Sequence, residues 1–135
     1  MNLDFQKLLP ETFSLQSRVW IYQSNRLLNL SEALQLEELL ADFTKNWTAH
    51  QEPVKGYANL FFGQFIILMA DESNVKVSGC STDSSVRFIK NIEQLFHLNL
   101  FDRQSLAFVK EGKVQILPIS QLQYALNNGF IQPDT

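Results

Sequence analysis

The chain has a single cysteine, Cys80, and it lacks an apolar run long enough to cross a membrane. One cysteine excludes an intrachain disulfide and a cysteine-rich zinc site, so a reducing compartment is expected. The longest apolar stretch, residues 60–70, is shorter than the roughly 20 residues that a transmembrane helix needs. The first residues also lack the apolar region of a signal peptide. We therefore expect a cytoplasmic protein without a membrane partner.

The sequence also lacks the glycine-rich loops that bind nucleotides, since neither G-x-x-x-x-G-K-[ST] nor G-x-G-x-x-G occurs in it. Charged residues make up 19% of the chain, and the net charge is −3. Proteins that bind nucleic acid usually display a basic patch or stripe. The acidic balance therefore argues against a nucleic-acid partner, and no motif indicates a cofactor.

The chain does hold enough apolar material for one folded domain over residues 1–135. Apolar residues make up 45% of its 135 residues, and a chain of this size buries about two thirds of its unfolded surface. If residues 60–70, LFFGQFIILMA, form a strand, their side chains alternate between its two faces, and both faces are apolar. A strand of this kind is covered on both sides. We expect one central strand there, followed by a turn at residues 71–74 and a short strand at residues 75–78.

The remaining patterns predict an α+β fold. The first six main elements match a ferredoxin-like (split β-α-β) antiparallel sheet with two helices on one face, to which a C-terminal β-hairpin and a short helix are added. We expect the second sheet face to be covered in part by that hairpin and helix and in part by a second subunit in a homodimer. The expected elements are a helix at 2–9, a strand at 18–26, a helix from an N-cap at Ser31, strands at 60–70 and 75–78, a helix at 82–97 with Val86, Ile89, Ile92, Leu95 and Phe96 buried, strands at 105–110 and 113–117, and a helix at 118–128 ending before Gly129.

Residues 78–85, SGCSTDSS, form the sharpest candidate site because they lie where a strand turns into a helix. Free backbone N–H groups and the helix dipole bind anions there and activate a thiol. In this interpretation Cys80 is a nucleophile, Arg87 assists it, Asp83 lies between them, and nearby hydroxyls bind the anion: Ser81, Thr82, Ser84 and Ser85.

The arrangement is similar to the phosphate-binding loop of cysteine-dependent phosphatases, although Cys80 and Arg87 enclose one residue more. Asp83 would also place a negative charge inside such a loop. The structural alternative is that Ser81 or Thr82 caps the helix while Cys80 packs as a small buried side chain.

A second candidate site is a pocket of aromatic and basic side chains at one end of the sheet. Aromatic rings with a few polar groups are typical of ligand pockets, and they are equally typical of the edge of a core. Trp47 and His50 are about one helical turn apart, so they can point together. The candidate lining residues are Trp20, Tyr22, Arg26, Trp47 and His50.

Two further patterns are weaker. Residues 55–62, KGYANLFF, resemble the RNP1 octamer of RNA-recognition domains, and residues 19–22 resemble the start of RNP2. Asn59 stands where an aromatic side chain should stack on a base, so RNA binding is the less favoured function. Potential metal ligands do not fall in a spacing such as H-E-x-x-H, and no metal site is expected from them: His50, Asp71, Glu72, Asp83 and His97.

Four segments together resemble a family of small single-domain bacterial proteins of unknown function: SRVWIYQSNR, GQFIILMADE, SGCSTDSSVRFIK and LFDRQSLAF. Some members of that family are labelled "ABC transporter ATPase". Such an activity requires a phosphate loop and its lysine, which this chain lacks. The resemblance therefore implies no catalytic residues.

The sequence leaves two main functions open, with RNA binding as a less favoured third. The first is a regulatory or interaction domain that binds a small anionic ligand or a protein partner without catalysis. The second is an enzyme or anion-binding protein that depends on Cys80 and on the helix N-terminus at residues 79–85. Whether Cys80 is an exposed thiolate separates these two functions.

Overall fold

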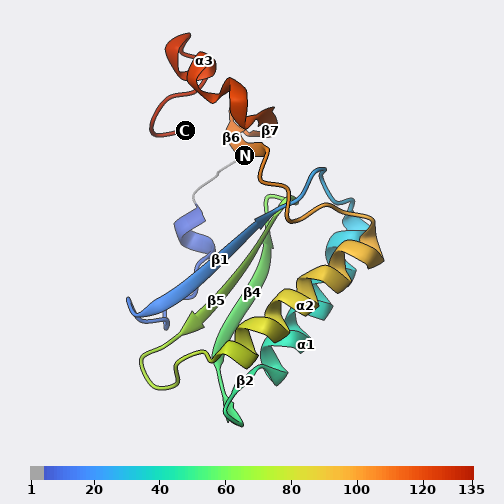
Figure 1. Cartoon of the computed structure of the whole chain (residues 1–135), viewed down its shortest axis with the longest axis vertical. Coiled ribbons are helices and arrows are strands. Elements are labelled where there is room, and N and C mark those ends of the chain that lie inside the picture. The colour runs from blue at the N-terminus through green and yellow to red at the C-terminus, as the bar shows by residue number, and fades with distance from the viewer. Residues whose placement is uncertain (1–4) are drawn as a thin grey trace.

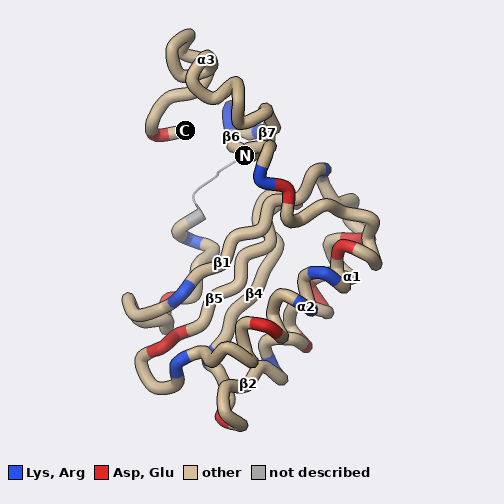
Figure 2. Tube along the Cα trace, in the orientation of Figure 1, with Lys and Arg blue, Asp and Glu red and all other residues tan. Residues whose placement is uncertain are grey.

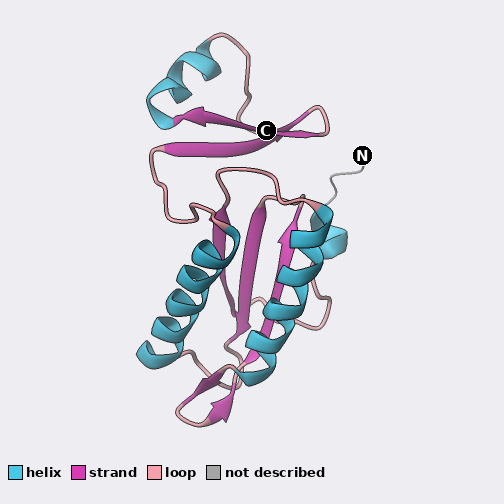
Figure 3. Ribbon diagram, turned by 90° about the vertical axis from the view of Figure 1, so that its right-hand side faces the viewer, coloured by secondary structure: helices cyan, strands magenta, loops and turns pink. Residues whose placement is uncertain are grey.

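The computed structural model describes residues 5–135 and has an α+β fold. Its main sheet contains β1 (Ser17–Gln23), β4 (Lys55–Phe61) and β5 (Phe65–Asp71), in the order β1-β5-β4. Both neighbouring pairs are antiparallel. The helices α1 (Leu30–Asn46) and α2 (Gly79–Phe96) lie side by side on one face of this sheet, as predicted (Figure 1 and Figure 3).

The chain from residue 105 onward forms a separate unit. The strands β6 (Ser105–Lys110) and β7 (Lys113–Pro118) pair in their own two-stranded sheet, and they are followed by a 3₁₀ turn (Ile119–Gln121) and α3 (Leu122–Asn127). Figure 3 shows this unit beyond the end of the main sheet. We call residues 105–135 the C-terminal unit and residues 17–100 the body.

The four-stranded ferredoxin-like sheet is not confirmed. The strand β6, which was expected to complete the sheet, pairs with β7 instead. The predicted C-terminal hairpin and short helix are confirmed. The hairpin turns at Glu111 (φ 53°) and Gly112 (φ 76°), and Gly129 (φ 69°) follows the C-cap of α3, which is the left-handed position that glycine favours.

Residues 60–70 are not one strand, which corrects the sequence-based expectation. They contain the end of β4, a turn at Phe62–Gln64 and the start of β5. Phe62 and Gly63 adopt positive φ angles of 56° and 68°, and glycine makes such a turn accessible. The side chain of Gln64 is buried and donates to the backbone oxygen of Ser24 over 2.9 Å. The turn therefore looks like strand core in the sequence. The strand expected at residues 75–78 is absent.

Both long helices begin at capping boxes. Asn29, rather than Ser31, is the N-cap of α1, and it exchanges hydrogen bonds with Glu32 over 2.8 and 3.0 Å. Ser78 caps α2 and accepts from the backbone N–H of Ser81 over 3.1 Å. The helix α2 therefore begins at Gly79, about one turn before the expected start. Two minor elements, 3₁₀ helix η1 (Phe5–Leu8) and hairpin β2 (Thr48–Ala49) with β3 (Glu52–Pro53), complete the fold; residues 2–4 of the predicted first helix lie outside the described residues.

The main core lies between the sheet and the two helices. Its most buried members are Leu36, Leu40, Ile66, Leu68 and Ile89, each with 0% exposure. Leu95 was expected among the buried residues of α2, but 63% of it is exposed. Polar Ser81 and Ser85 are buried instead, because their hydroxyls bond to backbone carbonyls of the preceding turn.

The sheet face opposite the helices is covered only in part. Leu9 and Phe13 of the N-terminal segment pack against the cluster of Phe61, Ile67 and Met69. Residues 107–109 of β6 border the same face across a groove of about 770 Å³. Val19 and Ile21 of β1 remain 50% and 65% exposed.

Candidate functional site

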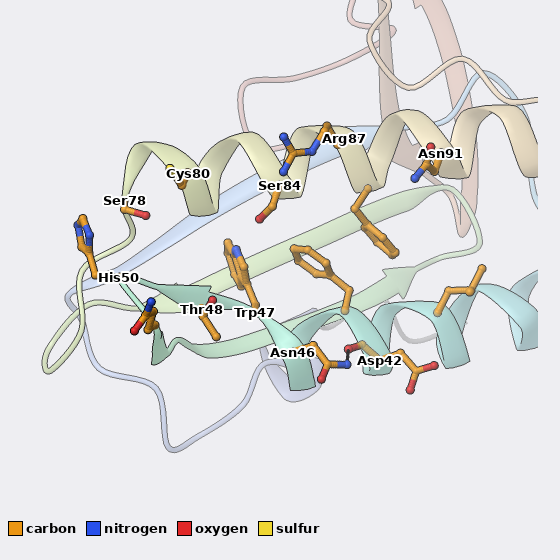
Figure 4. A pocket seen from close by; sticks show the side chains of 14 residues that line it. Asp42, Asn46, Trp47, Thr48, His50, Ser78, Cys80, Ser84, Arg87 and Asn91 are labelled. Carbon is orange, nitrogen blue, oxygen red and sulfur yellow. Dashed lines mark hydrogen bonds between the residues drawn. The ribbon is translucent and has the colours of Figure 1, made fainter.

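A groove of about 760 Å³ runs between α1 and α2. Each helix contributes side chains at spacings of three, four or seven residues, so one face of each helix borders it. Figure 4 shows Asp42 and Asn46 on one side, Ser84, Arg87 and Asn91 on the other, and Trp47 between them. The helical lining comprises Leu39, Asp42, Phe43 and Asn46 from α1 and Cys80, Ser84, Arg87, Phe88 and Asn91 from α2.

Aromatic rings form the floor of the groove. The rings of Phe43 and Phe88 are stacked, with centroids 4.5 Å apart and planes at 16°, and Trp47 lies 5.1 Å from Phe43. The indole Nε1 of Trp47 donates to the backbone oxygen of Ser81 over 2.9 Å. A Cβ atom at Gly56 would come within 3.0 Å of the Trp47 ring. Trp47 is therefore held from both sides, which fixes the separation of the helices at this end.

The tight turn between β2 and β3 closes one end of the groove with His50 and Gln51. Both residues have positive φ angles, 52° and 68°. Turns of this kind favour Asn-Gly, because a side chain in the left-handed region costs roughly 1 kcal/mol or more. The chain therefore accepts backbone strain at two residues whose side chains line the groove.

Three ionisable side chains that border the groove have no partner within the part of the chain that the structure describes. Within residues 5–135, no hydrogen bond or ion pair involves the side chains of Arg87, His50 or Asp42. Asn46 donates only to the backbone oxygen of Asp42, over 2.9 Å. The groove thus combines an apolar floor with a guanidinium and a carboxylate that are free to bind something else.

The expected phosphate-binding loop around Cys80 does not form. Cys80 and Arg87 lie on one continuous helix, seven residues or about 10 Å apart, so they do not enclose an anion together. Cys80 is exposed and lines the groove, whereas Asp83 is exposed and outside it. The hydroxyls bond to their own helix: Ser81 and Thr82 to the oxygen of Ser78, Ser84 to that of Ser81, and Ser85 to that of Thr82.

The five residues of the expected aromatic pocket do not meet in one place. Trp47 and His50 line the groove. Trp20 packs edge-on against Trp47 at 5.8 Å from beneath, in the core. Tyr22 lies further along β1, next to Phe101 at 5.5 Å, where burial raises the pKa of its hydroxyl.

Arg26 is a structural residue at the opposite end of the two helices. Its guanidinium donates to both carboxylate oxygens of Glu32, over 2.9 and 2.7 Å, and to the backbone oxygen of Phe96 over 2.6 Å. It therefore ties the start of α1 to the end of α2. Arg26 and the backbone N–H of Asn29 together lower the pKa of Glu32 to about 2.

The potential metal ligands in the sequence, from which no metal site was expected, do not form a cluster in the described part of the chain. No group of three histidine, cysteine, aspartate or glutamate residues in the described part of the chain could hold an ion. Asp71 is instead a buried clamp, which accepts from Ser73 N–H over 2.9 Å and from the N–H and hydroxyl of Ser14 over 3.0 and 2.7 Å. These hydrogen bonds hold the pKa of Asp71 well below its usual range, and the bond from the Ser73 N–H has the largest effect.

The octamer that resembles RNP1 is covered by the N-terminal segment. Lys55 donates to the oxygen of Thr12, and the hydroxyl of Tyr57 donates to that of Leu8. The ring of Tyr57 also packs on Phe13. Figure 2 shows acidic and basic positions interspersed along the trace. The aromatic ring of Tyr57 is therefore covered and is not displayed to stack on a base.

No helix in residues 5–135 combines the length and the apolar character that crossing a membrane requires. The chain matches no protein-family model, no curated protein and no solved structure. Its resemblance to the small bacterial family therefore stays a prediction, and the groove between α1 and α2 is the site on which a function can be argued.

Proposed function

We propose that this chain is a ligand-binding domain, without catalysis of its own, whose site is the groove between α1 and α2. The ligand is a small molecule with a flat apolar body and an anionic group. The observation that carries the proposal is the aromatic floor of Phe43, Phe88 and Trp47 beneath an unpartnered Arg87. Sites for small molecules combine apolar walls with a few polar groups that fix orientation.

The charges of the groove favour a particular kind of ligand. Arg87 can form a bidentate pair with a carboxylate or a phosphate group, while Asp42 on the opposite helix can accept a hydrogen bond from an amine or a hydroxyl. A ligand that bears both groups on a flat body would satisfy both sides of the groove. Its apolar part would lie over the aromatic floor.

Binding can be tested with three probes that separate these features: benzoate, benzylamine and 4-(aminomethyl)benzoate. Amide chemical shifts are followed by NMR during titration. We expect 4-(aminomethyl)benzoate to bind most tightly and to shift the signals of His50, Gln51 and Arg87. Shifts confined to the opposite sheet face, at Ile67 and Met69, would contradict the proposal.

The matched variants are Arg87→Gln and Lys90→Gln, because both residues are exposed cations on α2 and only Arg87 lines the groove. A charged hydrogen bond contributes about 1.5–3 kcal/mol, so Arg87→Gln should weaken benzoate at least about tenfold. Lys90→Gln should leave the affinity unchanged. Equal effects of the two variants would indicate general charge attraction rather than a site.

A second candidate function rests on the exposure of Cys80 within the same groove. As a nucleophile it would need an activating group, and His50 is the groove residue with suitable chemistry. The test is the rate of Cys80 alkylation against pH, with and without phosphate. Fast alkylation at acidic pH that phosphate slows would support this function. A rate that rises only in alkaline solution, with no effect of phosphate, would contradict it.

A further inference from the structure

The outer edge of β1 has unpaired backbone groups whose positions follow from the hydrogen bonds at its two ends. The backbone N–H of Glu72 donates to the backbone oxygen of Gln16 over 3.2 Å, and the backbone N–H of Ser24 donates to the backbone oxygen of Gln64 over 2.8 Å. These pairs continue the register that joins β1 to β5. Bonded and non-bonded pairs alternate in an antiparallel ladder, so even-numbered residues bond to β5. The N–H and C=O groups of Ser17, Val19, Ile21 and Gln23 therefore point away from the sheet.

One outward N–H group on the opposite edge of the sheet has a side-chain partner, whereas the outward groups at the centre of β1 have none among residues 5–135. The same alternation directs the N–H of Leu60 outward from β4, and the side chain of Asn59 accepts a hydrogen bond from it over 2.8 Å. No equivalent bond reaches Val19 or Ile21 among residues 5–135. Natural edge strands are usually interrupted by proline, lysine or a bulge. In β1 the single charge is Arg18, and the exposed side chains beside it are apolar.

We propose that a second copy of this chain adds its own β1 to this edge in antiparallel orientation. The partner strand occupies the place that a fourth strand would take in a ferredoxin-like sheet, and Figure 1 shows no strand beyond β1. The result is a continuous six-stranded sheet with the helices of both copies on one face. Two-fold symmetry makes such an interface self-complementary.

The surroundings of β1 select the register. Residues 100–106 border Ile21–Gln23 across a gap of about 330 Å³, so the partner strand aligns with residues 17–21. A two-fold axis at Arg18 would place the Arg18 side chains of the two subunits opposite each other. An axis at Val19 places Val19 opposite Val19 of the partner subunit, and Arg18 opposite Trp20 of the partner subunit.

This register is also favoured by the chemistry of the paired side chains. Arg18 already lies over the ring of its own Trp20, 4.9 Å from the ring centroid, so a second indole offers it the same kind of contact. Val19 and Ile21, which are 50% and 65% exposed, become cross-strand neighbours of apolar or small side chains. The interface is independent of the ligand groove, which lies between the helices.

The first test is the molar mass by sedimentation equilibrium, where a dimer has twice the monomer mass of 15.6 kDa. Val19→Pro removes the central outward N–H, which an edge strand tolerates because that group makes no bond within its own sheet. Two-fold symmetry then removes two hydrogen bonds per dimer, so we expect dissociation to increase at least about tenfold. Val19→Thr keeps the N–H and should remain dimeric.

A cysteine pair tests the register in a Cys80→Ser background and does not depend on how well Val19→Pro folds. At the axis, the Cα atoms of two Val19→Cys residues are about 5.5 Å apart, which suits a disulfide. Two Ile21→Cys residues are separated by four positions along the strands, about 13 Å. We expect oxidation to link Val19→Cys into dimers and to leave Ile21→Cys monomeric. A monomeric mass at several hundred micromolar protein, or a link at position 21 instead of 19, would overturn the proposal.

Discussion

The body and the C-terminal unit bury their apolar side chains to very different extents. The body encloses its main core between three strands and two long helices, with ten buried residues in one cluster. The C-terminal unit has a hairpin and a six-residue helix around four buried residues: Phe108, Leu117, Ala125 and Ile131. An isolated two-stranded hairpin is marginally stable in water. The C-terminal unit should therefore depend on the body for its order, whereas the body should not depend on it.

The link between the two regions is narrow. The side-chain amide of Gln23, at the end of β1, donates to the backbone oxygen of Ser105 and accepts from the N–H of Ala107 over 2.8 Å. This amide therefore bonds to β6 as a backbone peptide group would. Beyond it, the two regions border the apolar groove over the open sheet face.

The largest expected effect separates the two cores. Leu68→Ala removes a side chain with 0% exposure from the centre of the body, which should cost about 2–5 kcal/mol and lower the melting temperature by roughly 10 °C. Phe108→Ala should open the C-terminal unit while leaving the melting of the body almost unchanged. Circular dichroism measures the main transition, and hydrogen exchange at residues 105–118 measures the local opening.

The control for these variants is Leu95→Ala, because 63% of Leu95 is exposed and such substitutions usually change stability by less than about 0.5 kcal/mol. A fall in melting temperature for Phe108→Ala as large as that for Leu68→Ala would mean that both regions belong to one cooperative core.

Acid should weaken the body, which contains two carboxylates with lowered pKa values, Glu32 and Asp71. The pKa values of Glu32, about 2, and of Asp71, lower than usual, lie below the values expected in an unfolded chain, near 4. Their contributions to stability are therefore complete above about pH 4–5 and are lost as the pH falls through the folded-state values. The urea midpoint of the body should fall between pH 5 and pH 2. Glu32→Gln should make the urea midpoint depend less on pH. If the midpoint of Glu32→Gln depends on pH as strongly as that of the unsubstituted protein, the pairing of Arg26 with Glu32 does not stabilise the body.

A contrast between local signals and tertiary packing separates what the sequence could predict from what it could not. The aromatic and branched residues of β1, the amphipathic period of α1 and the Glu-Gly turn of the last hairpin are local signals, and each predicted its element. The turn at Phe62–Gln64 gave no such signal, because Phe62 and Gln64 are buried or partly buried by tertiary packing. Gly63 was the one local indication.

The residues of the candidate site were predictable only in part, and its geometry was not predictable. Cys80, Ser84, Arg87 and Asn91 recur at helical spacing and could have been identified as one face of α2. The facing residues Asp42 and Asn46 belong to a helix nearly forty positions earlier, and no local pattern pairs the two. The interpretation of residues 78–85 as a loop failed because Ser78 caps the helix earlier, which places Cys80 and Arg87 along one helical face.

A smaller effect tests the link between the regions. Gln23→Ala removes both amide bonds to β6, which together contribute about 1–3 kcal/mol. We expect faster hydrogen exchange in β6 and β7, with little change in the body. Gln94→Ala, on the exposed surface of α2, provides the control. Unchanged exchange in β6 would show that the apolar contacts alone hold the C-terminal unit in place.

The smallest effect compares the helix starts of the two regions. Asn29 accepts from the N–H of Glu32 at the start of α1, whereas Gln121 at the start of α3 makes no side-chain capping bond. Loss of a capping side chain costs about 1 kcal/mol, so Asn29→Ala should lower the stability of the body by that amount in urea unfolding. Gln121→Ala should change neither the urea midpoint nor the exchange rates in α3. If Gln121→Ala destabilises the chain as much as Asn29→Ala does, the stability of α3 depends on its first turn. The C-terminal unit would then have a local source of order beyond its contacts with the body.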